Sequence, residues 1–290
     1  MSFMRLTRID GQSGACLTRS RPAPTFREKG VLGAIKEALD YRCQNAEIAR
    51  NCHLSRDHQW VFVDWGEGLA LDVIRPGGIL IDVDHHFDMH FPAVSLPQGL
   101  IHLTGASAEK IVELASGYIL DLTHEDRLPE GSFIMPALAL GWFDTIYKVN
   151  LEGQYREEEK IVCLQRPDGI VAGPLVERED AVERRAVNII HVNINEFASV
   201  FERGAKTVTF NLDLDFFCEA REKSARLFRA REVGEKIVAP AAPELTTAAV
   251  SPSYWSHNGD SAAILKELLW YCLKPDGAKT GNWQLSIPFV

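Results

Sequence analysis

Residues 78–91 read GILIDVDHHFDMHF, and this stretch decides the fold. Three apolar residues, 79–81, run directly into a group of Asp and His side chains. An apolar run that polar residues replace within a few positions is typical of a buried parallel strand that leaves its sheet. Open α/β sheets bind ligands at the carboxyl ends of their strands. We therefore expect a central strand here and a functional site where it ends.

The side chains after this strand form a metal-ligand pattern. Asp84, His86 and Asp88 alternate as D-x-H-x-D, and alternate side chains of an extended chain share a face. A second β-branched and aromatic run, TVTFNLDLDFF, ends in Asp213 and Asp215. Either pattern alone is often only a helix cap or a solvated strand end. Together they bring like charges to strand ends, which is costly without a cation, so we predict a metal site.

The ligand set indicates the kind of ion. Four carboxylates and one imidazole suit a hard or borderline divalent ion such as Mn²⁺ better than a zinc site of the thiolate type. Carboxylates that bridge can hold two ions roughly 3.5–4 Å apart. We therefore expect Mn²⁺ as the cofactor, with two ions in one centre.

These motifs resemble those of the arginase and histone-deacetylase-like ureohydrolase superfamily, which carries D-x-H-x-D after one central strand and D-x-D after a later one. Between them, residues 134–141 read IMPALALG. This segment resembles the I-x-P-A-x-x-x-G motif of a divergent branch that includes peptide-modifying arginases. The resemblance covers about residues 60–272. It implies an arginase-like α/β fold, a three-layer sandwich in which helices flank a central, mostly parallel β-sheet.

The resemblance also implies an activity. It points to a manganese-dependent peptide arginase, which hydrolyses the guanidinium of arginine residues in a precursor peptide to ornithine and urea through a metal-activated hydroxide. Such a hydrolase acts on C–N bonds other than peptide bonds, during maturation of ribosomally made peptides. Asp84 and Asp213 would be the bridging carboxylates, and Asp88 would also orient the hydroxide. His102 would give a proton to the leaving amine, with His124 as the second candidate. The implied metal ligands are Asp84, His86, Asp88, Asp213 and Asp215.

One departure from the family pattern concerns a further His ligand. In this branch it follows a short strand, in a context like D-H-N-E. A strand expected over residues 60–64 (WVFVD) puts Trp65 where that His would be. Because Trp65 cannot bind a metal, we expect one of the two ions to be held weakly. Water or one of four side chains remains open as the replacement: Asp64, Glu67, His53 and His58.

The departure keeps two other functions open. Asp84, His86 and Asp213 alone would make a mononuclear amidohydrolase of the deacetylase type. A non-catalytic binding module on the same fold is the other alternative. The carboxylate that would bind a guanidinium is also undecided, among Glu67, Asp121, Glu125, Asp126 and Asp260. Four aromatic residues are candidates to stack on its plane: Trp65, Phe87, Trp142 and Trp255.

Composition bounds the class of protein. The 290 residues carry a net charge of −9, which disfavours nucleic acid as a partner and is compatible with a cationic substrate such as an arginine-containing precursor peptide. The N-terminus lacks the apolar core of a signal peptide, and we see no apolar run long enough for a membrane span. Six scattered cysteines without a C-x-x-C pair favour a cytoplasmic location. The oligomeric state stays open.

Periodicity predicts the organisation of the chain. We expect a single arginase-like domain over residues 1–290, with an irregular lead-in at 1–28 and a C-terminal tail at 274–290. Helical spacing of apolar residues predicts helices over 30–52 and 261–273. The APAAP segment at 239–243 is expected to be an extended linker.

Overall fold

The computed structural model describes residues 45–49, 51–90, 100, 107–119, 128, 130–151, 156–165, 181–251, 254–255 and 257–272. For residues 45–49, 157–165, 181–185, 269, 270 and 272 it describes the backbone alone. The expected lead-in at 1–28 and tail at 274–290 lie outside these ranges.

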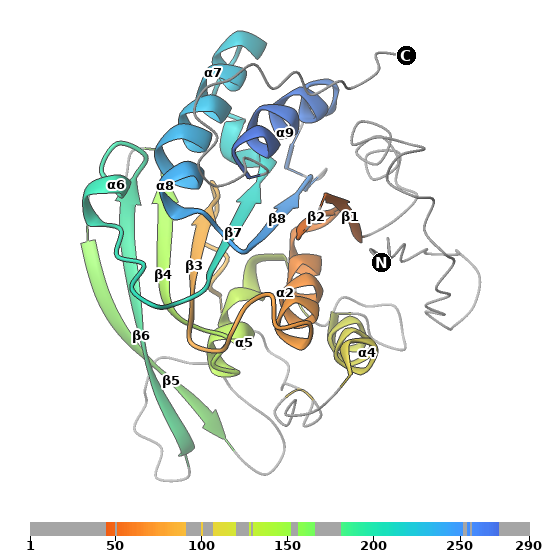
Figure 1. Ribbon diagram of the computed structural model, residues 1–290, viewed down its shortest axis with the longest axis vertical. Coiled ribbons are helices and arrows are strands. Elements are labelled where there is room, and N and C mark those ends of the chain that lie inside the picture. The colour runs from red at the N-terminus through yellow and green to blue at the C-terminus, as the bar shows by residue number, and fades with distance from the viewer. Residues whose placement is uncertain are drawn as a thin grey trace, which may run out of the picture.

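All described strands belong to one eight-stranded sheet in the order β1-β2-β8-β7-β3-β4-β6-β5 (Figure 1). The six central strands pair in parallel, and the antiparallel strands β1 and β5 form the two edges. The strands are β1 (Asn45–Ala49), β2 (Cys52–Ser55), β3 (Gly78–Val83), β4 (Phe143–Asn150), β5 (Arg156–Gln165), β6 (Ala181–Asn193), β7 (Val208–Asp213) and β8 (Leu245–Ala249).

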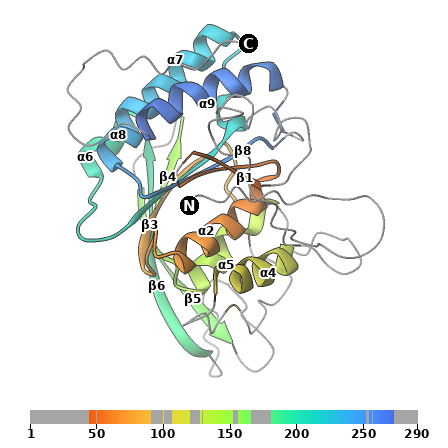
Figure 2. The same ribbon diagram turned by 45° about the vertical axis from the view of Figure 1, so that its right-hand side comes forward.

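Helices cover both faces of this sheet, so the predicted three-layer α/β fold is confirmed (Figure 2). One face carries α2 (Val61–Ala70), α4 (Ala108–Ile119) and α5 (Ile134–Ala139), with the 3-10 turns η1 (His58–Trp60) and η2 (Glu130–Ser132). The other face carries α6 (Phe197–Val200), α7 (Lys223–Val233), the π-helical turn η4 (Gly234–Val238), α8 (Ala239–Ala241) and α9 (Asn258–Cys272). The 3-10 turn η3 (Leu214–Phe217) follows β7 directly.

Strand β3 is buried on both faces, as a continuous apolar run requires. Ile79, Ile81 and Val83 join the hydrophobic cluster under α7 and α9, whereas Leu80 points into the cluster under α2, α4 and α5. Asp82 has the same parity as Leu80 and therefore faces the α2 side. A charged residue inside this strand is thus buried in the sheet, directly before the predicted site.

Strand β7 pairs with β3 in parallel and repeats this arrangement. Asp82 lies opposite Asn211 in the register, so Asp84 and Asp213 leave the two strands at the same edge of the sheet. The central expectation from the sequence, that the two acidic motifs meet at one sheet edge, is confirmed.

Three local predictions were wrong. Residues 60–64, expected to be a strand, are helical: η1 ends at Trp60 and α2 begins at Val61. Of the helix expected over 30–52, residues 45–49 form strand β1 and Cys52 begins strand β2, whereas residues 30–44 and 50 lie outside the described part. Residues 239–241 of the expected linker form α8, which continues the helical path of η4.

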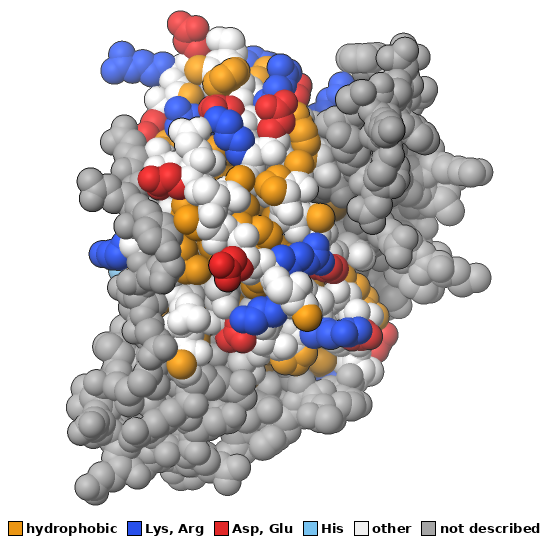
Figure 3. Space-filling model, turned by 60° about the vertical axis from the view of Figure 1, so that its left-hand side comes forward, with side chains coloured by type: hydrophobic (Ala, Val, Ile, Leu, Met, Phe, Trp, Pro, Cys, Tyr) orange, Lys and Arg blue, Asp and Glu red, His pale blue; other side chains and the backbone are white. Residues whose placement is uncertain are grey.

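The surface of the described part carries charges of both signs. On the face drawn in Figure 3, Lys and Arg side chains are interspersed with Asp and Glu side chains among hydrophobic ones. Among the described helices, none combines the length and the apolar character that crossing a membrane requires.

Candidate metal centre

The first group of ligand-type side chains surrounds His58, at the start of η1. Its Nδ1 atom lies 2.8 Å from Asp88 Oδ2, 3.1 Å from Asp213 Oδ2 and 3.5 Å from Asp84 Oδ2. All four side chains are buried. The imidazole is therefore enclosed by carboxylates from the ends of β3 and β7.

The second group lies on the other side of Asp84. His86 Nδ1 is 2.7 Å from Asp215 Oδ2 and 3.9 Å from Asp84 Oδ1. Asp84 thus presents Oδ2 to His58 and Oδ1 to His86. Ligand atoms lie within 4.8 Å of one another in two sets of three residues, His58, Asp84 and Asp88, and Asp84, His86 and Asp215. One carboxylate shared between two imidazole-containing groups is the arrangement expected of a bridging ligand.

The D-x-H-x-D motif does not stay extended. Strand β3 ends at Val83, and the backbone N–H of His86 donates to Asp84 Oδ1 over 2.8 Å, which closes a turn. Asp88 has a φ of +51°, a left-handed conformation that short polar side chains tolerate. The turn leaves His86 partly exposed and returns Asp88 to the buried side, so these two residues serve different groups.

Buried oxygens without donors suit a cation at this position. Among the described residues, Asp84 Oδ2 and both carboxylate oxygens of Asp215 accept no hydrogen bond. Burial, and then the charges of Asp213 and Asp84, raise the pKa of Asp215 to about 9. Burial likewise raises the pKa of Asp88. In the absence of a metal the centre therefore retains protons that a divalent ion would displace. The donor set of carboxylates and imidazoles fits Mn²⁺.

A buried ion pair lies directly behind the ligands. Lys148 Nζ is 2.6 Å from Asp82 Oδ2 and 3.6 Å from Asp84 Oδ2. All three residues are buried. Burial opposes the charged form of Lys148, but Asp82 and Asp84 outweigh it and raise the lysine pKa. Burial also opposes the charged form of Asp84, which Lys148 outweighs, so the pKa of Asp84 is lowered.

Polar side chains of the sheet also hold the far side of the His58 ring. Asn211 Nδ2 lies 2.9 Å from His58 Nε2 and donates to Asp82 Oδ1 over 2.8 Å. Thr247 donates to Asn211 Oδ1 over 2.8 Å. The ring of Phe133 packs against His58 with a centroid distance of 4.5 Å. The sheet thus fixes the imidazole from behind.

The placement of Trp65 at the position of the missing His was wrong. Trp65 lies in α2, where its indole N–H donates to Thr247 Oγ1 over 3.2 Å and its ring packs in the core. Because β2 ends at Ser55, the strand-end turn contains His58 rather than Trp65. Of the open alternatives, His58 is the one that lies beside Asp84, Asp88 and Asp213, and the Asp57-His58 pair is the signal that could have pointed to it.

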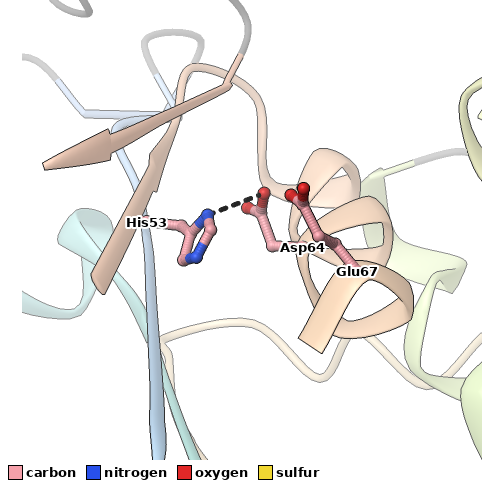
Figure 4. A group of neighbouring side chains, drawn as sticks. All are labelled: His53, Asp64 and Glu67. Atoms are coloured by element: carbon pink, nitrogen blue, oxygen red, sulfur yellow. Dashed lines mark ion pairs between the residues drawn. The ribbon is translucent and has the colours of Figure 1, made fainter. Parts of the chain in front are cut away.

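The other open replacements gather away from His58. Figure 4 shows His53 of β2 facing Asp64 and Glu67 of α2. His53 Nδ1 is 3.3 Å from Asp64 Oδ1, and Ser55 Oγ donates to Asp64 Oδ2 over 3.2 Å. These side chains form a separate group with ligand atoms within 4.8 Å of one another, and none of them belongs to the two groups that share Asp84.

Several predicted site residues fall outside the described part of the chain, and Asp260 is engaged elsewhere. Asp260 Oδ2 accepts from Arg226 Nε and Nη2 over 3.0 and 2.5 Å, and Lys223 Nζ is 3.1 Å from its Oδ1. A carboxylate held by two cations is a poor choice to receive a substrate guanidinium. The candidates outside the described residues are His102, Asp121, His124, Glu125 and Asp126.

The aromatic candidates differ in exposure. Trp142 stacks on Phe62 in the core, and Trp255 is buried with its indole donating to Ser261. Phe87 is 37% exposed beside His86 in the chain. The sequence reasoning missed Tyr254, which is 54% exposed with its ring centroid 4.8 Å from that of His86.

Comparison with known proteins adds no identification: no protein-family model matches the chain, and no curated protein matches it.

The raised pKa values predict how stability depends on pH in the metal-free protein. The pKa of Asp215 is about 9 in the folded protein and about 3.9 in the unfolded chain. Between these two pH values the folded state holds a proton that the unfolded state has lost. Stability should therefore fall as pH rises across this window. Burial opposes the charged form of His58, but the carboxylates, chiefly Asp213, outweigh it and raise the His58 pKa. The stability that the charged imidazole contributes is therefore also lost as pH rises. Melting in EDTA should occur at a lower temperature at pH 9 than at pH 6.

Mn²⁺ should oppose this trend, because ions compete with protons for the same atoms and bind more tightly as pH rises. A chelated protein that gains stability between pH 6 and 9 would contradict the prediction.

Proposed function

We propose that this chain is a manganese-dependent hydrolase of C–N bonds, and specifically a peptide arginase that converts arginine residues of a precursor peptide to ornithine with release of urea. The observation that carries the proposal is the pair of ligand groups that share Asp84, one around His58 and one around His86. The resemblance of the D-x-H-x-D, D-x-D and IMPALALG motifs to peptide-modifying arginases supplies the substrate class.

The charges at the centre favour two ions. Lys148 offsets one of the buried carboxylates that converge here. With every carboxylate ionised, the remaining negative charge would be that of four carboxylates, which two divalent ions would neutralise. The carboxylates in question are Asp82, Asp84, Asp88, Asp213 and Asp215.

The position of His58 weakens the case for the mononuclear alternative. A deacetylase-type site needs only Asp84, His86 and Asp213. This alternative was kept open because a His ligand of the second ion appeared to be missing. With His58 beside Asp84, Asp88 and Asp213, each of the two ions has an imidazole ligand available. The buried carboxylates argue against the non-catalytic binding module, because burying so many of them at one edge of the sheet is costly unless they bind a cation.

The residues of the chain can be assigned roles in this reaction. Two bound divalent ions would supply a water of lowered pKa as the nucleophile at neutral pH. Asp88, buried against His58, is placed to accept a hydrogen bond from that water and orient it. A histidine gives the leaving amine its proton, and His102 remains our candidate for this step.

A carboxylate at the border of the centre is our candidate for the substrate guanidinium. Glu130 Oε1 accepts a hydrogen bond from the backbone N–H of His58 over 3.4 Å. Burial, and then the charge of Asp57, raise the pKa of Glu130, which indicates that a cation would be favourable beside it. Arg guanidinium pairs well with carboxylates through two N–H donors. Tyr254, exposed next to His86, is placed to pack on the bound side chain.

Release of urea from an arginine-containing peptide tests the proposal. The protein loaded with Mn²⁺ should release urea and leave ornithine, whereas Asp84→Asn should release none, because Asp84 belongs to both ligand groups. The same peptide with citrulline in place of arginine is the substrate control. Mn²⁺ shown to be bound, with no urea from a panel of arginine peptides, would refute the arginase assignment. Hydrolysis of an acetyl-lysine peptide instead would select the amidohydrolase.

A further inference from the structure

Ser251 stands at the end of β8, next to the strand that carries Asp213. Its hydroxyl donates to Asp213 Oδ2 over 2.5 Å, and the residue is fully buried. Asp213 Oδ1 accepts from the backbone N–H of Asp215 over 3.1 Å. Each oxygen of this carboxylate thus accepts a hydrogen bond, and the two donors come from different parts of the chain. Neither acidic motif contains Ser251, and the proposed chemistry does not use it.

The backbone of Ser251 ties the same point to the segment that leads to His58. The N–H of Ser251 donates to the carbonyl of Arg56 over 2.8 Å, and the N–H of Val250 donates to the carbonyl of Ser55 over 3.0 Å. One residue therefore connects the Asp213 carboxylate with the turn in which His58 begins η1. Asp213 Oδ2 itself lies 3.1 Å from His58 Nδ1.

The conformation of Ser251 is unusual for a serine. Its φ is +46°, in the left-handed region that glycine adopts without cost and other residues rarely enter. Residues kept in sparsely populated conformations cluster at functional sites, where the surrounding structure holds them. Glycine would satisfy this backbone more easily, so what serine adds at this position is its hydroxyl.

We propose that Ser251 is a positioning residue that fixes Asp213 relative to His58 and so sets the affinity of the centre for divalent ions. The inference rests on the metal centre of the proposed function. Partners that orient metal ligands typically change affinity by about 10–100-fold when they are removed. Ser251→Ala should therefore weaken Mn²⁺ binding by about that factor.

A pair of variants separates the hydroxyl from the backbone. Ser251→Ala and Ser251→Gly both lack the hydroxyl, but only glycine relieves the positive φ. Titration calorimetry with Mn²⁺ should give both variants the same weakened affinity, whereas the metal-free Gly variant should melt at a higher temperature than the Ala variant. Thr209→Val is the matched control: Thr209 is buried on the same strand as Asp213, and its hydroxyl has no hydrogen-bond partner among the described residues. This control should bind Mn²⁺ like the wild type.

The outcomes distinguish this inference from the function on which it rests. Equal Mn²⁺ affinities for wild type and Ser251→Ala would overturn the role of Ser251 and leave the centre standing. Recovery of affinity in Ser251→Gly would overturn it as well, because the backbone and not the hydroxyl would then be responsible. A wild-type protein that binds no Mn²⁺ would overturn both. If Ser251→Ala does not fold, the Gly variant provides the comparison.

Discussion

His58→Ala should leave the protein with one Mn²⁺ ion where the wild type binds two. The substitution removes the imidazole that Asp84, Asp88 and Asp213 surround, and it leaves the group around His86 intact. Loss of partners behind a metal ligand costs about 10–100-fold in affinity, so loss of the ligand itself should cost at least ~100-fold at this half of the centre. Metal content after equilibrium dialysis measures the stoichiometry.

Trp65→Phe is the control for that experiment. It keeps an aromatic ring in the core, but it removes the hydrogen bond to Thr247 and leaves a smaller buried side chain. Both ions should remain, because Trp65 is not a ligand. If His58→Ala retained two ions, or Trp65→Phe lost one, the assignment of His58 as the missing ligand would be wrong.

Lys148→Met should be the most destabilising single substitution behind the centre. It removes the only cation that the described residues place against Asp82, and it leaves a buried carboxylate with Asn211 as its remaining donor. Breaking a buried ion pair by removing one partner costs about 3–5 kcal/mol. Urea denaturation of the metal-free protein should show a loss of this size in the free energy of unfolding.

The double variant Asp82→Leu/Lys148→Met provides the comparison. Replacing both members of a buried pair by apolar residues is often neutral, so much of the lost stability should return. Full recovery is not expected, because Asn211 loses an acceptor. A Lys148→Met protein as stable as the wild type would show that Lys148 is not needed to offset the buried charge of Asp82.

The sequence predicts the central part of the fold because a parallel strand leaves a strong local signal. Residues 79–83 and 208–212 are apolar on the α7 side and end in acidic residues, so their place in the sheet and the direction of the site follow from the pattern. The convergence of the candidate ligands Asp84, Asp213 and Asp215 follows in turn, because parallel strands end at one edge.

What the sequence could not predict depends on long-range packing. Residues 60–63 are β-branched and aromatic, a pattern typical of a strand, yet they lie in η1 and in α2, which packs on β2 and β8. That error placed Trp65, which cannot bind a metal, at the position where the resemblance implies a His ligand, and left His58 as one of several open replacements. The turn that separates His86 from Asp88 depends on a hydrogen bond to Asp84 and a left-handed Asp88, which no periodicity reports.

Anomalous scattering at the manganese edge, from crystals grown with Mn²⁺, tests the central claim most directly. We predict two peaks about 3.5–4 Å apart, one beside His58, Asp88 and Asp213 and the other beside His86 and Asp215, with Asp84 between them. A single peak, or peaks at other residues with this edge of the sheet empty, would contradict it.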